Sequence, residues 1–194
     1  MTRPEVSEKC IGSIRLRNPG PWYAGGIFIP KRPDQLPYHM APHLLTYTRH
    51  VFLPLTTVCH NRCGYCSFRT PVHDGCVLFP EYVEETMRRS AALGCTEALF
   101  TFGERPGLER GFTEQIVRYG YSDILDYCYD LCLLSIEHGL LPHTNAGIMT
   151  RDEMERFREV NASMGLMLET TADLPAHANS PGKNPATRIQ MIEE

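Results

Sequence analysis

The stretch that decides the fold spans residues 58 to 68 and reads Val58-Cys59-His60-Asn61-Arg62-Cys63-Gly64-Tyr65-Cys66-Ser67-Phe68. Its cysteines have the spacing C-x3-C-x2-C and follow an apolar, β-branched run, 50–58, that predicts a strand. A cubane iron-sulfur cluster is held by cysteine thiolates, and three of them leave one iron open. A catalytic zinc likewise keeps one position free for a reacting ligand. The spacing therefore favours a cluster with an open iron.

A structural zinc site is the main alternative, with His60, His73 or Cys76 as its fourth ligand. Structural zinc sites usually pair two ligand doublets across an intervening segment. No second C-x2-C or H-x3-H follows the cysteine loop. We therefore rank zinc below the cluster, and a disulfide below zinc.

Composition and charge limit the classes of protein. The chain has 194 residues, 42% hydrophobic and 22% charged, which suits one globular domain with a core. Its net charge of −4 gives no basic excess, so nucleic acid is not expected as the main partner. The N-terminal residues lack the apolar segment of a signal peptide, and no apolar run is long enough to span a membrane. We expect a cytoplasmic protein without a membrane partner.

Two regions differ in composition. Residues 1–49 hold seven of the 15 prolines and show no periodicity, which predicts an irregular, Pro-rich N-terminal arm. From residue 50 to 194, strand-like and helix-like segments alternate. Strands are predicted at 50–58, 97–102, 140–144 and 162–169, the last buried on both faces. Helices are predicted at 81–93, from a Ser122 cap to 139, from a Thr150–Glu153 capping box to about 160, and from Asn184 to the end.

Four consecutive βα units predict an α/β fold with a parallel sheet and right-handed crossovers. A closed (β/α) TIM-type barrel needs eight such units and about 250 residues. The sequence therefore predicts a partial barrel made of the first four units. We expect either that the chain is a fragment, truncated within the barrel, or that another chain completes it.

Functional residues of such barrels collect at the C-terminal ends of the strands. The three cysteines follow the end of the first predicted strand. The other strand ends carry the remaining candidates: Gly103 and Glu104, His143 and Asn145, and Glu169. His143 and Asn145 are candidates for facing a substrate.

The cysteine loop resembles the signature of radical S-adenosylmethionine (SAM) enzymes, C-x3-C-x-aromatic-C, with Tyr65 as the aromatic residue. The resemblance implies that Cys59, Cys63 and Cys66 hold a [4Fe-4S] cluster whose fourth iron is chelated by SAM. It also places Tyr65 at the SAM site. Gly103-Glu104 resembles the Gly-Gly-Glu motif, whose backbone contacts the SAM ammonium, although Phe102 replaces the first glycine.

Two further SAM contacts are implied by the same resemblance. Related enzymes have a SAM-contacting carboxylate where Glu169 stands, and an arginine that binds the SAM carboxylate where Arg188 stands. A guanidinium suits this role because its donors match a carboxylate in a bidentate fork.

Longer strings narrow the resemblance to the CofG-type subunit of 7,8-didemethyl-8-hydroxy-5-deazariboflavin (FO) synthase. The strings lie at 51–57, 62–66, 101–106, 141–145, 161–169 and 181–183. The implied reaction belongs to coenzyme F-420 biosynthesis. A 5'-deoxyadenosyl radical abstracts a hydrogen atom from a hydroxybenzyl-uracil adduct, and cyclisation with loss of ammonia, a lyase reaction, gives the deazaflavin.

The resemblance also implies partners, namely a one-electron reductant of the flavodoxin or ferredoxin type and a CofH-type companion subunit or domain. Three alternatives stay open. The first alternative is that the chain is the first domain of a bifunctional FO synthase. The second is a CofH- or aminofutalosine-type relative, and the third is a metal-binding module without catalysis. No general base can be identified from the sequence.

Overall fold

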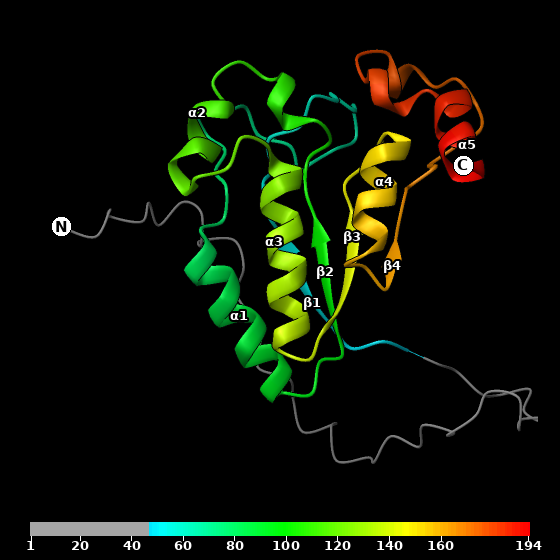
Figure 1. Ribbon diagram of the computed structural model, residues 1–194. Coiled ribbons are helices and arrows are strands. Elements are labelled where there is room, and N and C mark those ends of the chain that lie inside the picture. The colour runs from blue at the N-terminus through cyan, green and yellow to red at the C-terminus, as the bar shows by residue number, and fades with distance from the viewer. Residues whose placement is uncertain (1–46) are drawn as a thin grey trace, which may run out of the picture. The chain divides into compact units, whose positions relative to one another are not determined.

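The computed structural model of the protein describes residues 47–194, so the predicted arm lies almost wholly outside the described residues (Figure 1). Four strands form one parallel sheet in the order β1-β2-β3-β4. They are β1 (His50–Pro54), β2 (Glu97–Thr101), β3 (Leu141–Asn145) and β4 (Ser163–Met164). The predicted parallel sheet is confirmed, and in the described part of the chain it is open rather than closed into a barrel.

Helices α1, α3 and α4 lie along one face of this sheet (Figure 1). The helices are α1 (Pro80–Ala92), α2 (Thr113–Ile116), α3 (Ile124–Glu137), α4 (Arg151–Arg158) and α5 (Pro185–Glu193). Proline occupies the first position of α1, and the Thr150–Glu153 capping box begins α4. The capping box satisfies amides that would have no partner at a helix start, and proline has no amide N–H to satisfy there. These two predicted helix starts are confirmed.

The core lies between the sheet and these helices. Side chains alternate along β1 and β2, so that Leu53 and Phe100 point toward the helices and are buried against residues such as Met87. Burying one side chain of this size contributes about 1.5–3 kcal/mol. On the opposite face, Phe52 and Leu141 are exposed. The sheet therefore has one face that packs against the helices and one open face, which corresponds to the interior side of a complete (β/α) barrel.

The first strand is shorter than predicted. Its ladder with β2 ends at Pro54, although 50–58 was predicted as one strand. Beyond the ladder, the Leu55 amide still donates to the Thr101 carbonyl at 3.1 Å, and isolated bridges pair Thr56 with Val77 and Val58 with Thr70. These contacts turn the segment into the cysteine loop, which explains why an apolar run continues past the strand.

The predicted strand at 162–169 is wrong in extent and in burial. Only Ser163–Met164 pairs with β3, and both residues are exposed. The amide of Gly165 still donates to the Thr144 carbonyl at 2.9 Å, but the Met167 carbonyl accepts from a side chain instead of a strand. The backbone beyond β4 is thus bound by Arg188, 21 residues away, which the hydrophobicity of this segment does not report.

Two smaller differences concern the segment between β2 and β3. Asp123, not Ser122, caps α3, because its side chain accepts from the amide of Leu125 at 2.7 Å while Ser122 bonds Asp126. The region 103–120, predicted as a loop, contains α2 and the short 3-10 helices Pro106–Leu108 and Val117–Tyr119.

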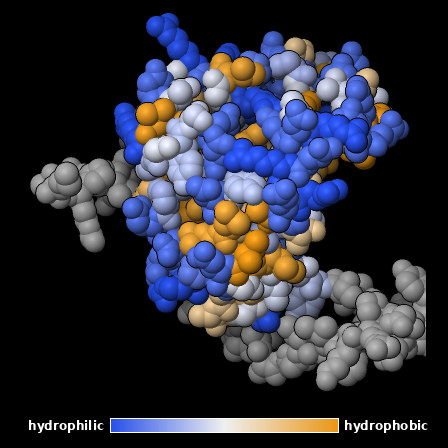
Figure 2. Space-filling model, in the orientation of Figure 1, coloured by the Kyte–Doolittle hydropathy of each residue, from blue (hydrophilic) through white to orange (hydrophobic). Residues whose placement is uncertain are grey.

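The surface of α3 is partly apolar. Leu133 and Ile136 are exposed on this helix, and Figure 2 shows hydrophobic surface over this part of the molecule. None of the helices in residues 47–194 combines the length and the apolar character that a membrane span requires.

Candidate functional site

The cysteine loop begins just beyond the C-terminal end of β1, where the barrel fold places functional residues. Cys59, Cys63 and Cys66 are all free thiols. Cys59 and Cys63 are half-buried, and Cys66 is exposed. None of the three is therefore consumed by a disulfide, and all are available as thiolate ligands.

Two of the thiols accept hydrogen bonds from other parts of the fold. The amide of Glu104 donates to Sγ of Cys59 at 3.2 Å, and the Ser180 hydroxyl donates to Sγ of Cys63 at 3.3 Å. Burial raises the pKa of Cys59, while hydrogen bonds from the backbone of Asn61 and Glu104 act in the opposite direction. Donors directed at sulfur are the environment that cluster-binding thiolates have, and they tune the cluster's potential. The donor set therefore fits an iron-sulfur cluster.

A distant segment holds the cysteine loop in shape. The amide of Arg62 donates to the Asn179 carbonyl at 3.1 Å, and that of Gly64 donates to the Ala176 carbonyl at 2.8 Å. In return, the amide of Gly182 donates to Oδ1 of Asn61 at 2.8 Å. The loop between β4 and α5 thus satisfies backbone groups of the cysteine loop more than 100 residues away in sequence.

Gly103 and Glu104 follow β2 and lie directly against the cysteine loop. The Gly103 amide donates to the Thr56 carbonyl at 3.0 Å, and the Glu104 carbonyl accepts from the His60 amide at 2.9 Å. A Cβ at Gly103 would overlap the carbonyl of Val58. Glycine is thus required here for close approach of two backbones.

The Glu104 side chain is buried in a polar network. Its Oε1 accepts from Nδ2 of Asn61 at 2.9 Å, and its Oε2 accepts from Nη2 of Arg188 at 2.6 Å and from the amide of Ile148 at 3.2 Å. Buried charges are tolerated when they are paired and hydrogen-bonded in this way. The network joins the cysteine loop, the end of β2 and α5.

Arg188 lies on the first turn of α5 and is only 1% exposed. Besides Glu104, its guanidinium donates to the carbonyls of Gly182 at 2.7 Å and Met167 at 2.5 Å. The structure therefore places this predicted SAM contact in the fold interior, bound to protein groups.

Glu169 and Tyr65 lie on the more exposed side of the site. Glu169 has a positive φ of 68° and pairs with Lys183 at 2.6 Å. The Tyr65 hydroxyl lies 2.9 Å from Nε2 of His177, although the ring is 55% exposed. Partial burial raises the pKa of Tyr65 to about 12, and nearby Cys63 and Glu169 act in the same direction.

His143 and Asn145 lie on the open face of the sheet, on β3. Nδ1 of His143 is 2.7 Å from the Ser163 hydroxyl and 3.8 Å from Oε1 of Glu97. A Cβ on Gly165 would come close to Nε2 of His143, so the glycine leaves room for the ring. These residues stand together, apart from the cysteine network.

The predicted alternatives for a fourth zinc ligand all have other partners. His60 contacts Glu109, His73 contacts Asp74 at 3.3 Å, and Cys76 is not without a partner either. Within residues 47–194, no three side chains of His, Cys, Asp or Glu are grouped to hold a single metal ion. In a cubane, each cysteine binds a separate iron, so the thiolates need not converge on one point.

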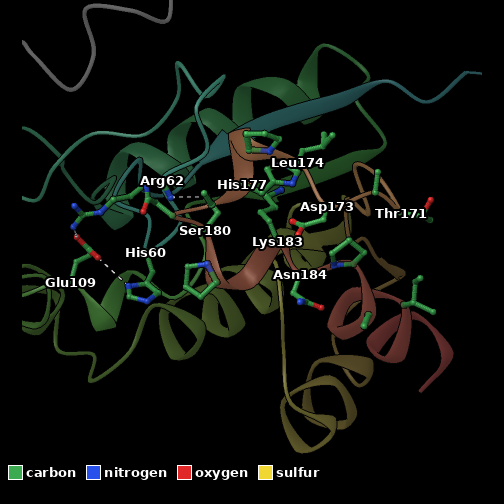
Figure 3. Close-up of a pocket in the computed structure, with 18 residues that line it drawn as sticks. His60, Arg62, Glu109, Thr171, Asp173, Leu174, His177, Ser180, Lys183 and Asn184 are labelled. Carbon is green, nitrogen blue, oxygen red and sulfur yellow. Dashed lines mark hydrogen bonds and ion pairs between the residues drawn. The ribbon is translucent and has the colours of Figure 1, made fainter.

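A groove of about 1380 Å³ borders the cysteine loop on its outer side (Figure 3). His60, Arg62 and Glu109 form one end of this groove, and the loop at 171–186 forms much of the rest. The three cysteines do not line the groove. Ser180, whose hydroxyl donates to Sγ of Cys63, does line the groove, so the groove reaches the loop beside this thiol.

Sequence reasoning missed several residues that shape the site: Asn61, Glu109, His177 and Ser180. Asn61 stands between two candidate ligands, a position that could have marked it as structural. His177 is buried, and its Nδ1 has no hydrogen-bond partner in the described part of the chain. Nothing in the local sequence marks the other two.

Comparison with known proteins gives the family. Residues 53–194 match the model of the radical SAM superfamily. The chain is 67% identical over 154 residues to a protein of Methanoculleus marisnigri named 7,8-didemethyl-8-hydroxy-5-deazariboflavin synthase. It is 64% identical over 149 residues to a protein of the same name from Methanosphaerula palustris. These matches cover 79% and 77% of this chain but 46% of each relative, so the chain spans about half of their length.

Solved structures agree on the fold. Methylornithine synthase (PylB) superposes with a TM-score of 0.55 at 20% identity, over 74% of this chain and 40% of that one. The FeFe-hydrogenase maturase HydG from Carboxydothermus hydrogenoformans gives 0.51 at 20% identity, over 74% and 32%. The cysteine loop at the end of β1, the open parallel sheet and the family match together lead to one conclusion: this chain belongs to the radical SAM superfamily.

Proposed function

We propose that the chain forms the cluster-binding part of a deazaflavin-forming FO synthase. The proposal rests above all on the 67% identity to a relative that bears this name, together with an ordered cysteine loop. The family implies a [4Fe-4S] cluster and SAM, and here Cys59, Cys63 and Cys66 would hold the cluster. When bound, the two cofactors supply a radical that abstracts a hydrogen atom from the substrate. Cyclisation with ammonia loss would follow, as in a lyase.

The SAM ammonium would meet the backbone after β2. The carbonyl of Gly103 accepts no hydrogen bond from any residue between 47 and 194, whereas the amides of Gly103 and Glu104 are both used. A carbonyl without a donor beside the cysteine loop is suited to accept from an ammonium group. This supports a SAM contact through the backbone of the Gly103-Glu104 motif. The Glu104 side chain would hold this backbone in position through its bonds to Asn61 and Arg188.

Tyr65 and Glu169 would border SAM on the other side. Both are accessible, and the effect of Glu169 on the pKa of Tyr65 indicates that they lie near each other. Lys183 pairs with Glu169 in the structure, so SAM would compete with or extend this ion pair. Arg188 would bind the SAM carboxylate only by giving up one of its present partners. We therefore propose that it contributes mainly through Glu104.

The open face of the sheet is where a substrate would lie. In a (β/α) barrel this face lines the interior, and it carries His143 with its Ser163 and Glu97 neighbours. A histidine whose Nδ1 is hydrogen-bonded to a hydroxyl, as here to Ser163, can donate or accept at Nε2. We propose His143 and Asn145 as substrate-facing residues.

The implied partners are a one-electron reductant of the flavodoxin or ferredoxin type and a CofH-type companion subunit or domain. We expect the four βα units of this chain to be poorly active or inactive alone. The test therefore uses the complete enzyme that contains this chain, anaerobically reconstituted, with SAM, a reductant and the hydroxybenzyl-uracil adduct. We expect release of 5'-deoxyadenosine that depends on the adduct, and formation of the fluorescent deazaflavin. Deoxyadenosine release that is indifferent to the adduct, but stimulated by another substrate of this superfamily, would contradict the FO synthase assignment while leaving the family intact.

His143→Gln tests the substrate-facing role separately. We expect this variant to keep cluster binding and SAM binding but to lose most deazaflavin formation. His138→Gln is the matched control, because His138 lies at the C-terminal end of α3 on the helix-covered side of the sheet. Equal activity of the two variants would remove His143 from the substrate site.

A further inference from the structure

We propose that Glu109 is a positioning residue that holds the cysteine loop from outside and sets the charge beside the cluster. Glu109 follows the 3-10 helix Pro106–Leu108 in the connection between β2 and α3. It belongs to none of the motifs that identify the family. Its side chain is only 14% exposed, although it lies near the surface groove.

Three basic side chains surround the Glu109 carboxylate. Oε1 lies 3.1 Å from Nδ1 of His60, and Oε2 lies 3.4 Å from Nη2 of Arg69 and 3.6 Å from Nη2 of Arg62. Figure 3 shows Glu109 facing His60 and Arg62 at one end of the groove. One carboxylate thus connects two residues of the cysteine loop, His60 and Arg62, with Arg69, which follows the loop.

These positions matter because of where they stand relative to the ligands. His60 follows Cys59 and Arg62 precedes Cys63, so Glu109 restrains the chain between the first two cysteines. Arg69 also donates through Nε to the carbonyl of Cys59 at 3.0 Å. Glu109 therefore orients the backbone that carries Cys59 without touching its sulfur.

The carboxylate also balances charge next to the cluster position. Arg62 and Arg69 bring two positive charges to the loop, and Glu109 is the acidic group that contacts both. Net charge near an iron-sulfur cluster is one of the factors that set its reduction potential. Loss of the negative charge would stabilise the reduced, more negative cluster, so the potential would move in the positive direction.

Glu109→Gln tests the charge while keeping the size of the side chain. After anaerobic reconstitution, we expect its cluster to have a more positive midpoint potential than the unaltered protein, measured at low salt because exposed charges are screened. The matched control is Glu114→Gln. Glu114 is exposed five residues further on, in α2, and its side chain has no hydrogen bond or ion pair within residues 47–194.

Arg62→Gln is the opposing variant, and it should fold normally because its side chain is 62% exposed. We expect its potential to move in the negative direction. A purely structural role for Glu109 would not produce shifts of opposite sign in the two variants. Shifts of the same sign, or none relative to Glu114→Gln, would overturn the charge part of the proposal.

Hydrogen exchange in the iron-free protein tests the positioning part. Loss of a charge-assisted hydrogen bond should speed exchange at the amides of His60 and Arg62 about tenfold in Glu109→Gln. Glu114→Gln should leave these rates unchanged. This measurement does not depend on enzyme activity or on cluster assembly. Unchanged exchange together with an unchanged potential would reject the role of Glu109 altogether.

Discussion

The guanidinium of Arg188 lies 2.6 Å from the carboxylate of Glu104, and both groups are buried although 84 residues separate them in sequence. This pair connects the first turn of α5 to the end of β2. Since Glu104 also bonds Asn61 and Cys59, the pair fixes the cysteine loop against the C-terminal part of the chain. The site is therefore held by an internal ion pair and not only by the loop's own sequence.

Arg188→Met should destabilise the fold strongly. Removing one partner leaves the Glu104 charge buried without its main partner, which typically costs about 3–5 kcal/mol. Denaturant unfolding monitored by circular dichroism measures this loss. Arg158→Met is the matched control, because Arg158 is exposed on α4, and its change should stay within about 0.5 kcal/mol. Equal stability of the two variants would show that the buried pair contributes little.

Gly103→Ala should disturb the cysteine loop. Its Cβ would overlap the backbone of Val58, so the two segments must separate. Such overpacking costs about 1–3 kcal/mol. We expect the variant to retain less iron after reconstitution. Gly107→Ala has nothing within contact distance of the added methyl group and should behave like the unaltered protein. Full iron retention by both variants would contradict the close approach.

The Arg105–Glu153 pair predicts a pH effect on stability. Two hydrogen bonds of 2.7 and 2.6 Å join the groups. Burial acts to raise the pKa of Glu153, but the hydrogen bonds from Arg105 and Thr150 outweigh it, so the pKa is lowered. A lowered pKa contributes stability above the unfolded value of about 4.3, and this contribution is lost as pH falls through the folded value.

The test compares unfolding of the unaltered protein with that of Glu153→Gln between pH 7 and pH 3. We expect the unaltered protein to be more stable at neutral pH and the difference to shrink as the pH falls below about 4.3. A difference that is constant over this range would mean that the lowered pKa does not contribute to stability.

Local signals in the sequence were sufficient for much of the fold. The alternation of strand and helix patterns predicted the parallel sheet, and Pro80 and the Thr150–Glu153 box marked the starts of two helices. These features depend on neighbouring residues, which a sequence displays directly. The prediction of a strand at 162–169 failed beyond Met164, where the side chain of Arg188 binds the Met167 carbonyl, a contact that hydrophobicity does not report.

The candidate site was predictable only in part. The three cysteines were predicted because their spacing is itself a signal, and Gly103-Glu104 was predicted because it follows a strand and resembles a family motif. The contacts of Ser180 with Cys63, of Asn61 with Glu104 and of Glu109 with the loop join residues 43 to 117 positions apart. No local pattern encodes such pairings. The internal position of Arg188 was missed for the same reason, because its sequence context suits a solvated helix residue equally well.

The most direct test of a three-cysteine cluster with an open iron is the electron paramagnetic resonance spectrum of the reduced, reconstituted protein with and without SAM. We expect a [4Fe-4S] signal that changes when SAM is added. The signal should be lost in Cys59→Ala, Cys63→Ala and Cys66→Ala but retained in Cys95→Ala, since Cys95 is a free thiol outside the loop. Stoichiometric zinc without sulfide, or a signal indifferent to both SAM and the three cysteines, would contradict the account.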